Sequence, residues 1–152
     1  MSARVLEATT VSYELEITID APREDVWRAL TDETDAWWLP DFHMVGEGSV
    51  VTFDARAGGQ LVEAREDGSG LLWYTVHMVT PGESLHLAGQ IFPQWGGPAT
   101  SLLHLALEEQ GESTVLRVTD AHHGHVSDAN VQSLESGWKQ LFTDGLKRHV
   151  EA

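Results

Sequence analysis

The sequence contains no cysteine and no long hydrophobic run, and both absences narrow what the chain can be. Without cysteine it forms no disulfide, no thiolate metal site and no thiol nucleophile, which fits a reducing cytoplasm. Residues 1–17 lack a basic segment followed by an apolar run, so we expect no signal peptide. No stretch approaches the ~20 apolar residues of a transmembrane helix. We therefore predict a cytoplasmic protein with no membrane insertion.

Basic residues are also scarce. Nine lysine and arginine residues stand against 24 acidic ones, which gives a formal net charge of −15 at pH 7. Such a surface repels nucleic acid and anionic membranes, so we predict no nucleic-acid partner. The acidity itself favours solubility, or attraction to a basic partner protein.

The sequence also lacks the motifs for catalysis or cofactor binding that can be recognised from the spacing of nearby residues. The sequence has no nucleophile elbow, no phosphate-binding glycine loop and no dinucleotide fingerprint, and we predict no cofactor. His122, His123 and His125 suggest a metal site, but neighbours on an extended segment point apart and no other ligand lies at a telling spacing. We expect these histidines in a solvated loop and predict no metal.

Hydrophobic periodicity predicts one α+β domain over residues 1–152. Residues 10–19 alternate apolar and polar side chains like a half-buried strand, and two short helices follow. Strand-like runs between turns fill residues 45–120, and an amphipathic helix spans about 128 to 149, with Ser127 and Asp128 as cap candidates. Consecutive hairpins predict a curved antiparallel sheet of six or seven strands around the helix. The alternative is a small β-barrel with a terminal helix.

Short fragments along nearly the whole chain carry a family resemblance. In order they are Ile17-Thr18-Ile19-Asp20-Ala21-Pro22, Val26-Trp27-Arg28-Ala29-Leu30-Thr31-Asp32, Gly58-Gly59, Glu63, Glu66-Asp67-Gly68-Ser69, Trp73, Pro81, Leu85, Gln90-Ile91, Trp95, Gly137-Trp138, Leu141 and Leu146. The sequence thereby resembles the START/SRPBCC superfamily, and within it the AHSA-like proteins, which are similar to the C-terminal domain of the heat-shock-protein ATPase activator. The resemblance implies a helix-grip fold with a cavity between sheet and helix. Members bind hydrophobic or amphipathic small molecules, and some catalyse cyclisation, dehydration or hydrolysis.

The sequence departs from this family at two places. Pro81-Gly82 stands where the family often has a double proline, and Asp120 stands where a histidine often ends the last strand. The separate domain of the full co-chaperone is missing, so we expect no activation of a chaperone ATPase.

Aromatic residues dominate the candidate binding site. The predicted ligand contacts are Trp37, Trp38, Phe53, Glu63, Trp73, Gln90, Phe92, Trp95, Trp138 and Phe142. Aromatic rings stack on flat ligands, but they are equally typical of an ordinary core. Two interpretations, close packing and room for a ligand, also apply to Gly89, Gly137 and Gly145. On the last helix a glycine costs about 1 kcal/mol relative to alanine, which something should offset.

Glu63 is the candidate for chemistry. It lies two residues from Leu61 on one strand, so it points inward if Leu61 does. Desolvation in an apolar cavity would raise the pKa of this carboxyl and suit it to act as a general base or ligand anchor. The alternatives are a bulge that turns Glu63 away, or an ion pair with Arg56 or Arg65.

Three functions fit these features, and whether the chain is an enzyme stays open. The first is binding of a hydrophobic, aromatic or lipid-like small molecule, with Glu63 or Gln90 orienting its polar end. The second is a polyketide cyclase or dehydratase-like reaction with Glu63 as base, and the third is an acidic protein-interaction domain. An exposed apolar sheet face around Leu102 and Ala106 would indicate a homodimer.

Overall fold

One antiparallel sheet of seven strands dominates the computed structural model, which describes residues 2–152. The strand order is β1-β7-β6-β5-β4-β3-β2. The strands are β1 (Thr9–Ile19), β2 (Val50–Phe53), β3 (Gln60–Ala64), β4 (Gly70–Thr80), β5 (Ser84–Ile91), β6 (Ala99–Gln110) and β7 (Ser113–Gly124). Within residues 2–152 the edge strands β1 and β2 do not pair with each other, so the barrel alternative is wrong.

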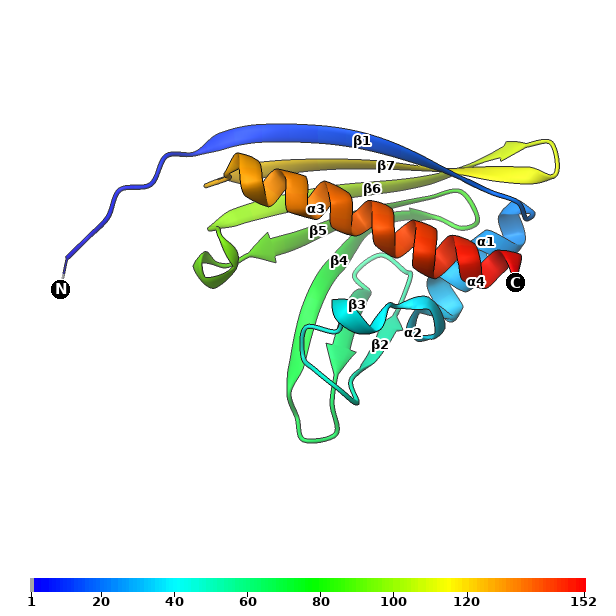
Figure 1. The fold of residues 1–152 in the computed structure, drawn as a ribbon, viewed down its shortest axis with the longest axis horizontal. Helices are drawn as coiled ribbons and strands as arrows, with labels where there is room; N and C mark the ends of the chain where they lie inside the picture. The colour runs from blue at the N-terminus through cyan, green and yellow to red at the C-terminus, as the bar shows by residue number, and fades with distance from the viewer. Residues whose placement is uncertain (1) are drawn as a thin grey trace.

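A long C-terminal helix crosses the concave face of this sheet (Figure 1). Its segments are α3 (Asp128–Gln140), a wider π-helical stretch η3 (Leu141–Lys147) and α4 (Arg148–Glu151). Ser127 caps it by accepting a hydrogen bond from the Asn130 backbone N–H at 3.2 Å, as predicted. The predicted helix-grip α+β fold is confirmed, but the uniform α-helix expected over 128–149 is not.

Two short helices, α1 (Arg23–Asp32) and α2 (Thr34–Trp37), follow β1 and lie near the C-terminal end of the long helix (Figure 1). A single 3-10 turn, η1 (Pro40–Phe42), lies in the loop between α2 and β2. Another, η2 (Pro93–Trp95), lies in the loop between β5 and β6. Among residues 2–152, no helix is long and apolar enough to cross a membrane.

The hydrophobic core lies between the inner sheet face and these helices. Along β6, Leu103, Leu105 and Leu107 are buried whereas Leu102 is 55% exposed on the outer face, which confirms the predicted alternation. The helix contributes a buried stripe that closes the core from the other side: Trp138, Leu141, Phe142 and Leu146. These side chains fill the space between the sheet and the C-terminal part of the helix. The space between the sheet and α3 is left as a cavity.

Candidate functional site

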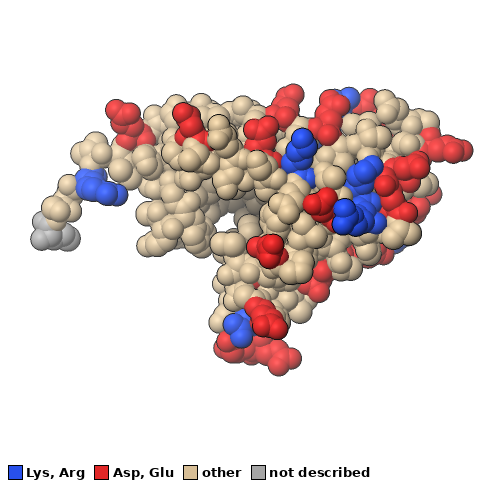
Figure 2. Space-filling view, viewed as in Figure 1, with Lys and Arg blue, Asp and Glu red and all other residues tan. Residues whose placement is uncertain are grey.

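A cavity of about 430 Å³ lies between the inner face of the sheet and helix α3. Strands β4 and β5, the ends of β6 and β7, the loops around η1 and η2, and α3 supply its walls. Figure 2 shows the hollow below the helix, bordered in this view mainly by uncharged residues while acidic side chains spread over the outside. The volume falls in the range of small-molecule sites, which is roughly 300–1,000 Å³.

Five of the ten predicted contact residues line this cavity: Trp38, Trp73, Gln90, Trp95 and Trp138. Trp95 belongs to the rim, because its side chain is 48% exposed and stands edge-on to Phe92 with ring centres 5.5 Å apart. Trp38 and Trp73 meet edge to face at 5.4 Å on the wall nearest the η1 loop. The cavity is therefore bounded on three sides by indole rings, which suits a flat apolar ligand.

The other five predicted contacts do not line this cavity. Trp37 and Phe142 are buried core residues in contact with each other, and Phe53 is packed against the same core. Phe92 is 56% exposed beside the cavity rather than in it, and Glu63 lies behind the wall. Periodicity indicates only that a side chain points inward. It does not separate the filled half of the interior from the open half.

The three inward glycines differ in how much space surrounds them. A Cβ on Gly145 would lie 2.4 Å from the Trp37 carbonyl oxygen, and one on Gly89 would lie 2.7 Å from that of Trp73. These two glycines therefore permit close packing, although Gly89 also lines the cavity. Gly137 lines the cavity too, and a Cβ there would find Phe42 at an ordinary 3.6 Å. Of the three, Gly137 is the position with room for a larger side chain.

Glu63 points inward with Leu61, as expected, and its side chain is 0% exposed. Its surroundings are polar, however. Oε1 accepts from the backbone N–H of Met44 at 3.0 Å and the indole N–H of Trp73 at 3.1 Å. Oε2 accepts from the Val45 N–H and the Ser49 hydroxyl, each at 2.7 Å. The loop between η1 and β2 thus folds over the carboxylate and supplies most of its donors.

The expected rise in the pKa of Glu63 is wrong. Burial by itself raises this pKa, but the hydrogen bonds from Ser49, Val45, Trp73 and Met44 together outweigh burial and hold the pKa below its ordinary value. Arg56 pairs with Asp54 at 2.8 Å rather than with Glu63. A carboxylate with a lowered pKa and no place in the cavity lining gives no support to the predicted role of general base. It anchors a loop to strand β3.

The expectation for His122 is also wrong. Strand β7 continues to Gly124, so His122 lies within the strand, 1% exposed, and lines the cavity. His123 points outward and bonds to Thr10. His125 also lines the cavity but bonds to the Glu7 carbonyl, so the three rings do not converge. Residues 2–152 contain no cluster of three or more metal-ligating side chains.

A buried polar network joins His122 to two strands of the sheet. Asp120, 0% exposed, accepts from His122 Nε2, the Tyr13 hydroxyl and the Ser101 hydroxyl, each at 2.7 Å. Because Ser101 donates to Asp120, it accepts from the Tyr74 hydroxyl at 2.8 Å. Burial, and then the charge of Asp120, raises the pKa of Tyr74, so this phenol remains a donor at neutral pH.

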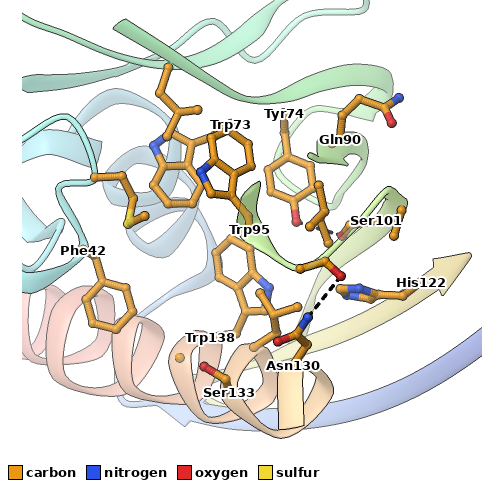
Figure 3. A pocket seen from close by; sticks show the side chains of 18 of the residues that line it. Phe42, Trp73, Tyr74, Gln90, Trp95, Ser101, His122, Asn130, Ser133 and Trp138 are labelled. Atoms are coloured by element: carbon orange, nitrogen blue, oxygen red, sulfur yellow. Dashed lines mark hydrogen bonds between the residues drawn. The ribbon is translucent and has the colours of Figure 1, made fainter. Parts of the chain in front are cut away.

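Figure 3 shows three members of this network, Tyr74, Ser101 and His122, on the sheet side of the cavity, with Asn130, Ser133 and Trp138 rising from α3 on the other. Trp138 Nε1 is the one buried side-chain nitrogen or oxygen in residues 2–152 without a hydrogen-bond partner. Native proteins rarely leave such a donor unpaired, and a water, an ion or a catalytic role commonly accounts for the exception. The predicted set missed His122, Ser101 and Tyr74. Alternation from Leu116 and Val118 along β7 could have placed His122 inward.

Comparison with known proteins places this geometry in a family. The sequence profile of the family described as "Activator of Hsp90 ATPase homolog 1-like protein" matches residues 20–151. The chain belongs to this family. No curated protein matches the sequence.

Several solved structures share the family's fold. CV1439 from Chromobacterium violaceum is 24% identical, with a TM-score of 0.66 over 93% of this chain and 97% of its own. Mll3558 from Rhizobium loti is 22% identical, with a TM-score of 0.71 over 91% and 96%. The Aha1 dimer from Colwellia psychrerythraea is also 22% identical, with a TM-score of 0.63 over 93% and 96%. At these identities the likeness establishes only the fold, so the ligand has to be inferred from the residues of this chain.

Proposed function

We propose that the chain binds a largely apolar, flat small molecule in the cavity between the sheet and α3. The observation that carries this proposal is the space of about 430 Å³ itself, which is lined mainly by apolar and aromatic side chains. A ligand that fills the space removes apolar surface from water. The indole rings of Trp38 and Trp73 give the ring system of such a ligand faces to pack against.

Gln90 is the remaining predicted polar contact. It lines the opening, where its amide oxygen accepts from the Thr100 hydroxyl at 3.0 Å. The Gln90 amide points away from the other labelled side chains of the cavity (Figure 3). Glu63 drops out of the orienting role because its oxygens are taken by four protein donors.

Closing the cavity tests the proposal. Gly137→Leu places a side chain in the ligand space, and we expect it to weaken binding of the neutral fluorophore N-phenyl-1-naphthylamine about tenfold or more, the equivalent of ~1.4 kcal/mol. The measurement is a fluorescence titration. Ser136→Leu is the matched control, since Ser136 is the exposed neighbour on the same helix. Equal binding by wild type and Gly137→Leu, or no binding by the wild type, would contradict the proposal.

The other predicted functions differ in how well they are supported. A cyclase or dehydratase that uses Glu63 as base is not supported, because Glu63 neither faces the cavity nor has a raised pKa. An acidic protein-interaction domain and a cytoplasmic location stay predictions, supported by the net charge of −15 and by the absence of cysteine.

A homodimer is the partner we propose for the outer sheet face. Leu102 stands there 55% exposed on strand β6, and a related fold from Colwellia psychrerythraea forms a dimer. If copies pair through this face, Leu102→Glu places two charges in the contact, and we expect a shift to monomer in light scattering after gel filtration. A wild-type protein that is monomeric throughout would count against this proposal.

A further inference from the structure

The two ring nitrogens of His122 are in different situations. Nε2 lies 2.7 Å from Asp120 Oδ2, and because an ionised carboxylate only accepts, Nε2 carries the proton. Nδ1 has no hydrogen-bond partner among residues 2–152, and it is not enclosed, since the one enclosed unpaired side-chain nitrogen or oxygen there is Trp138 Nε1. His122 lines the cavity. In the neutral ring, the lone pair of Nδ1 is therefore open to a bound molecule.

Asp120 fixes the ring in this state. Its Oδ2 accepts from His122 and Tyr13, and its Oδ1 accepts from Ser101, so the carboxylate is held from three directions. Tyr74 extends the chain of donors through Ser101. A hydrogen bond at one imidazole nitrogen sets which tautomer is present and how the ring is oriented. The neighbouring His123 has no such carboxylate and bonds only to Thr10 at the surface.

We propose that His122 is a general base that removes a proton from the bound molecule, with Asp120 as its positioning residue. The proposal rests on the binding function above and deepens it, because it defines the substrate class as a flat, largely apolar molecule with an acidic C–H or O–H. The substrate's C–H or O–H bond breaks, the proton bonds to Nδ1, and the electron pair stays on the substrate. The imidazolium that forms is stabilised by the Asp120 carboxylate beside it.

The opposite wall complements this step. Trp138 rises from α3 while His122 comes from β7, so a molecule in the cavity lies between these two residues (Figure 3). The indole ring of Trp138 gives a flat molecule an apolar surface to pack against on the side opposite His122.

A substrate that reports its own deprotonation tests the proposal. 5-Nitrobenzisoxazole is flat and largely apolar. When its ring C–H is removed, the ring N–O bond breaks and the coloured 2-cyano-4-nitrophenolate is released without any co-reactant. We expect saturable turnover at least about 10²-fold faster than the same concentration of free imidazole, because a positioned base contributes 10²–10⁴-fold. The rate should rise with pH to a plateau, as a single base requires.

Matched variants identify the base. His122→Gln should lose about 10²-fold or more of the turnover, whereas His123→Gln, its outward neighbour, should lose none. Asp120→Asn should lower kcat with little change in KM and should shift the pH profile, which a purely structural role would not do. Gly137→Leu should abolish turnover without touching either residue, and it serves as the test if the dyad variants fail to fold.

The outcomes separate the two proposals. Long-range ¹H–¹⁵N spectra of the imidazole rings at pH 8 should show His122 as the Nε2–H tautomer; a proton on Nδ1 would overturn the general-base proposal regardless of any probe. Quenching of tryptophan fluorescence by 5-nitrobenzisoxazole without turnover above imidazole would overturn it too, while leaving ligand binding intact. A probe that neither quenches nor reacts, together with no binding of N-phenyl-1-naphthylamine, would overturn both.

Discussion

Replacing Glu63 with glutamine is expected to lower the free energy of unfolding by about 3 kcal/mol or more, although the two side chains have the same size. The carboxylate accepts from two backbone N–H groups, one hydroxyl and one indole. In glutamine one acceptor oxygen becomes an NH₂ donor, which faces donors already pointing at it. The loss therefore combines missing charge-assisted bonds with buried N–H groups left unpaired.

Urea denaturation of the two proteins measures this loss. Glu66→Gln is the control, because Glu66 is an exposed acid three residues along the chain and should change stability by less than about 0.5 kcal/mol. A Glu63→Gln protein within 1 kcal/mol of wild type would show that the loop between η1 and β2 contributes little. Retained binding of N-phenyl-1-naphthylamine by the folded fraction would agree with a structural role.

Acid should reveal the same carboxylate. The pKa of Glu63 is lower in the fold than in the unfolded chain, so the unfolded state binds the extra proton first. The stability from Glu63 is present above its unfolded pKa, roughly 4.3, and is lost as pH falls through the folded value. Wild type should therefore lose stability more steeply than Glu63→Gln below about pH 4.5. Parallel pH curves would contradict the hydrogen-bonded site.

Periodicity in the sequence predicted the sheet and the long helix because burial of one face leaves a direct trace. The alternation of Leu103, Leu105 and Leu107 gave the inner face of β6, and the stripe from Trp138 to Leu146 gave the helix. The π-helical stretch left no such trace. It coincides with a contact between Gly145 and Trp37, two positions more than a hundred residues apart in the chain.

The site was harder to predict than the fold, for a reason visible at Glu63 and His122. Both point inward; parity along the strand predicted this for Glu63, and the same parity could have placed His122. What each does depends on its hydrogen-bond partners: a loop that brings three of the four donors to Glu63, and a carboxylate that holds His122. The pKa of an inward acid is set by those donors as much as by burial, so the direction of the side chain alone did not predict the low pKa of Glu63.

Gly145→Ala is the second change for which we expect a large effect, a loss of about 2 kcal/mol in the free energy of unfolding. The new Cβ would lie 2.4 Å from the Trp37 carbonyl oxygen, a backbone atom that cannot swing aside. Trp37 itself is buried, and its indole N–H donates to the Ala29 carbonyl at 2.7 Å. Relief of the clash must therefore push the C-terminal helix away from α2.

Gly137→Ala makes the same chemical change two helical turns earlier and should have the opposite effect. Its Cβ meets only Phe42 at 3.6 Å, so the gain in helix propensity, about 1 kcal/mol, should appear almost undiminished. Thermal unfolding of the two alanine variants side by side measures the contrast. Equal stabilisation of the two variants would contradict the close contact between the helix at Gly145 and Trp37. If the displaced helix also widens the cavity, Gly145→Ala should bind N-phenyl-1-naphthylamine more weakly, because the contact between Gly145 and Trp37 sets how close α3 lies to His122.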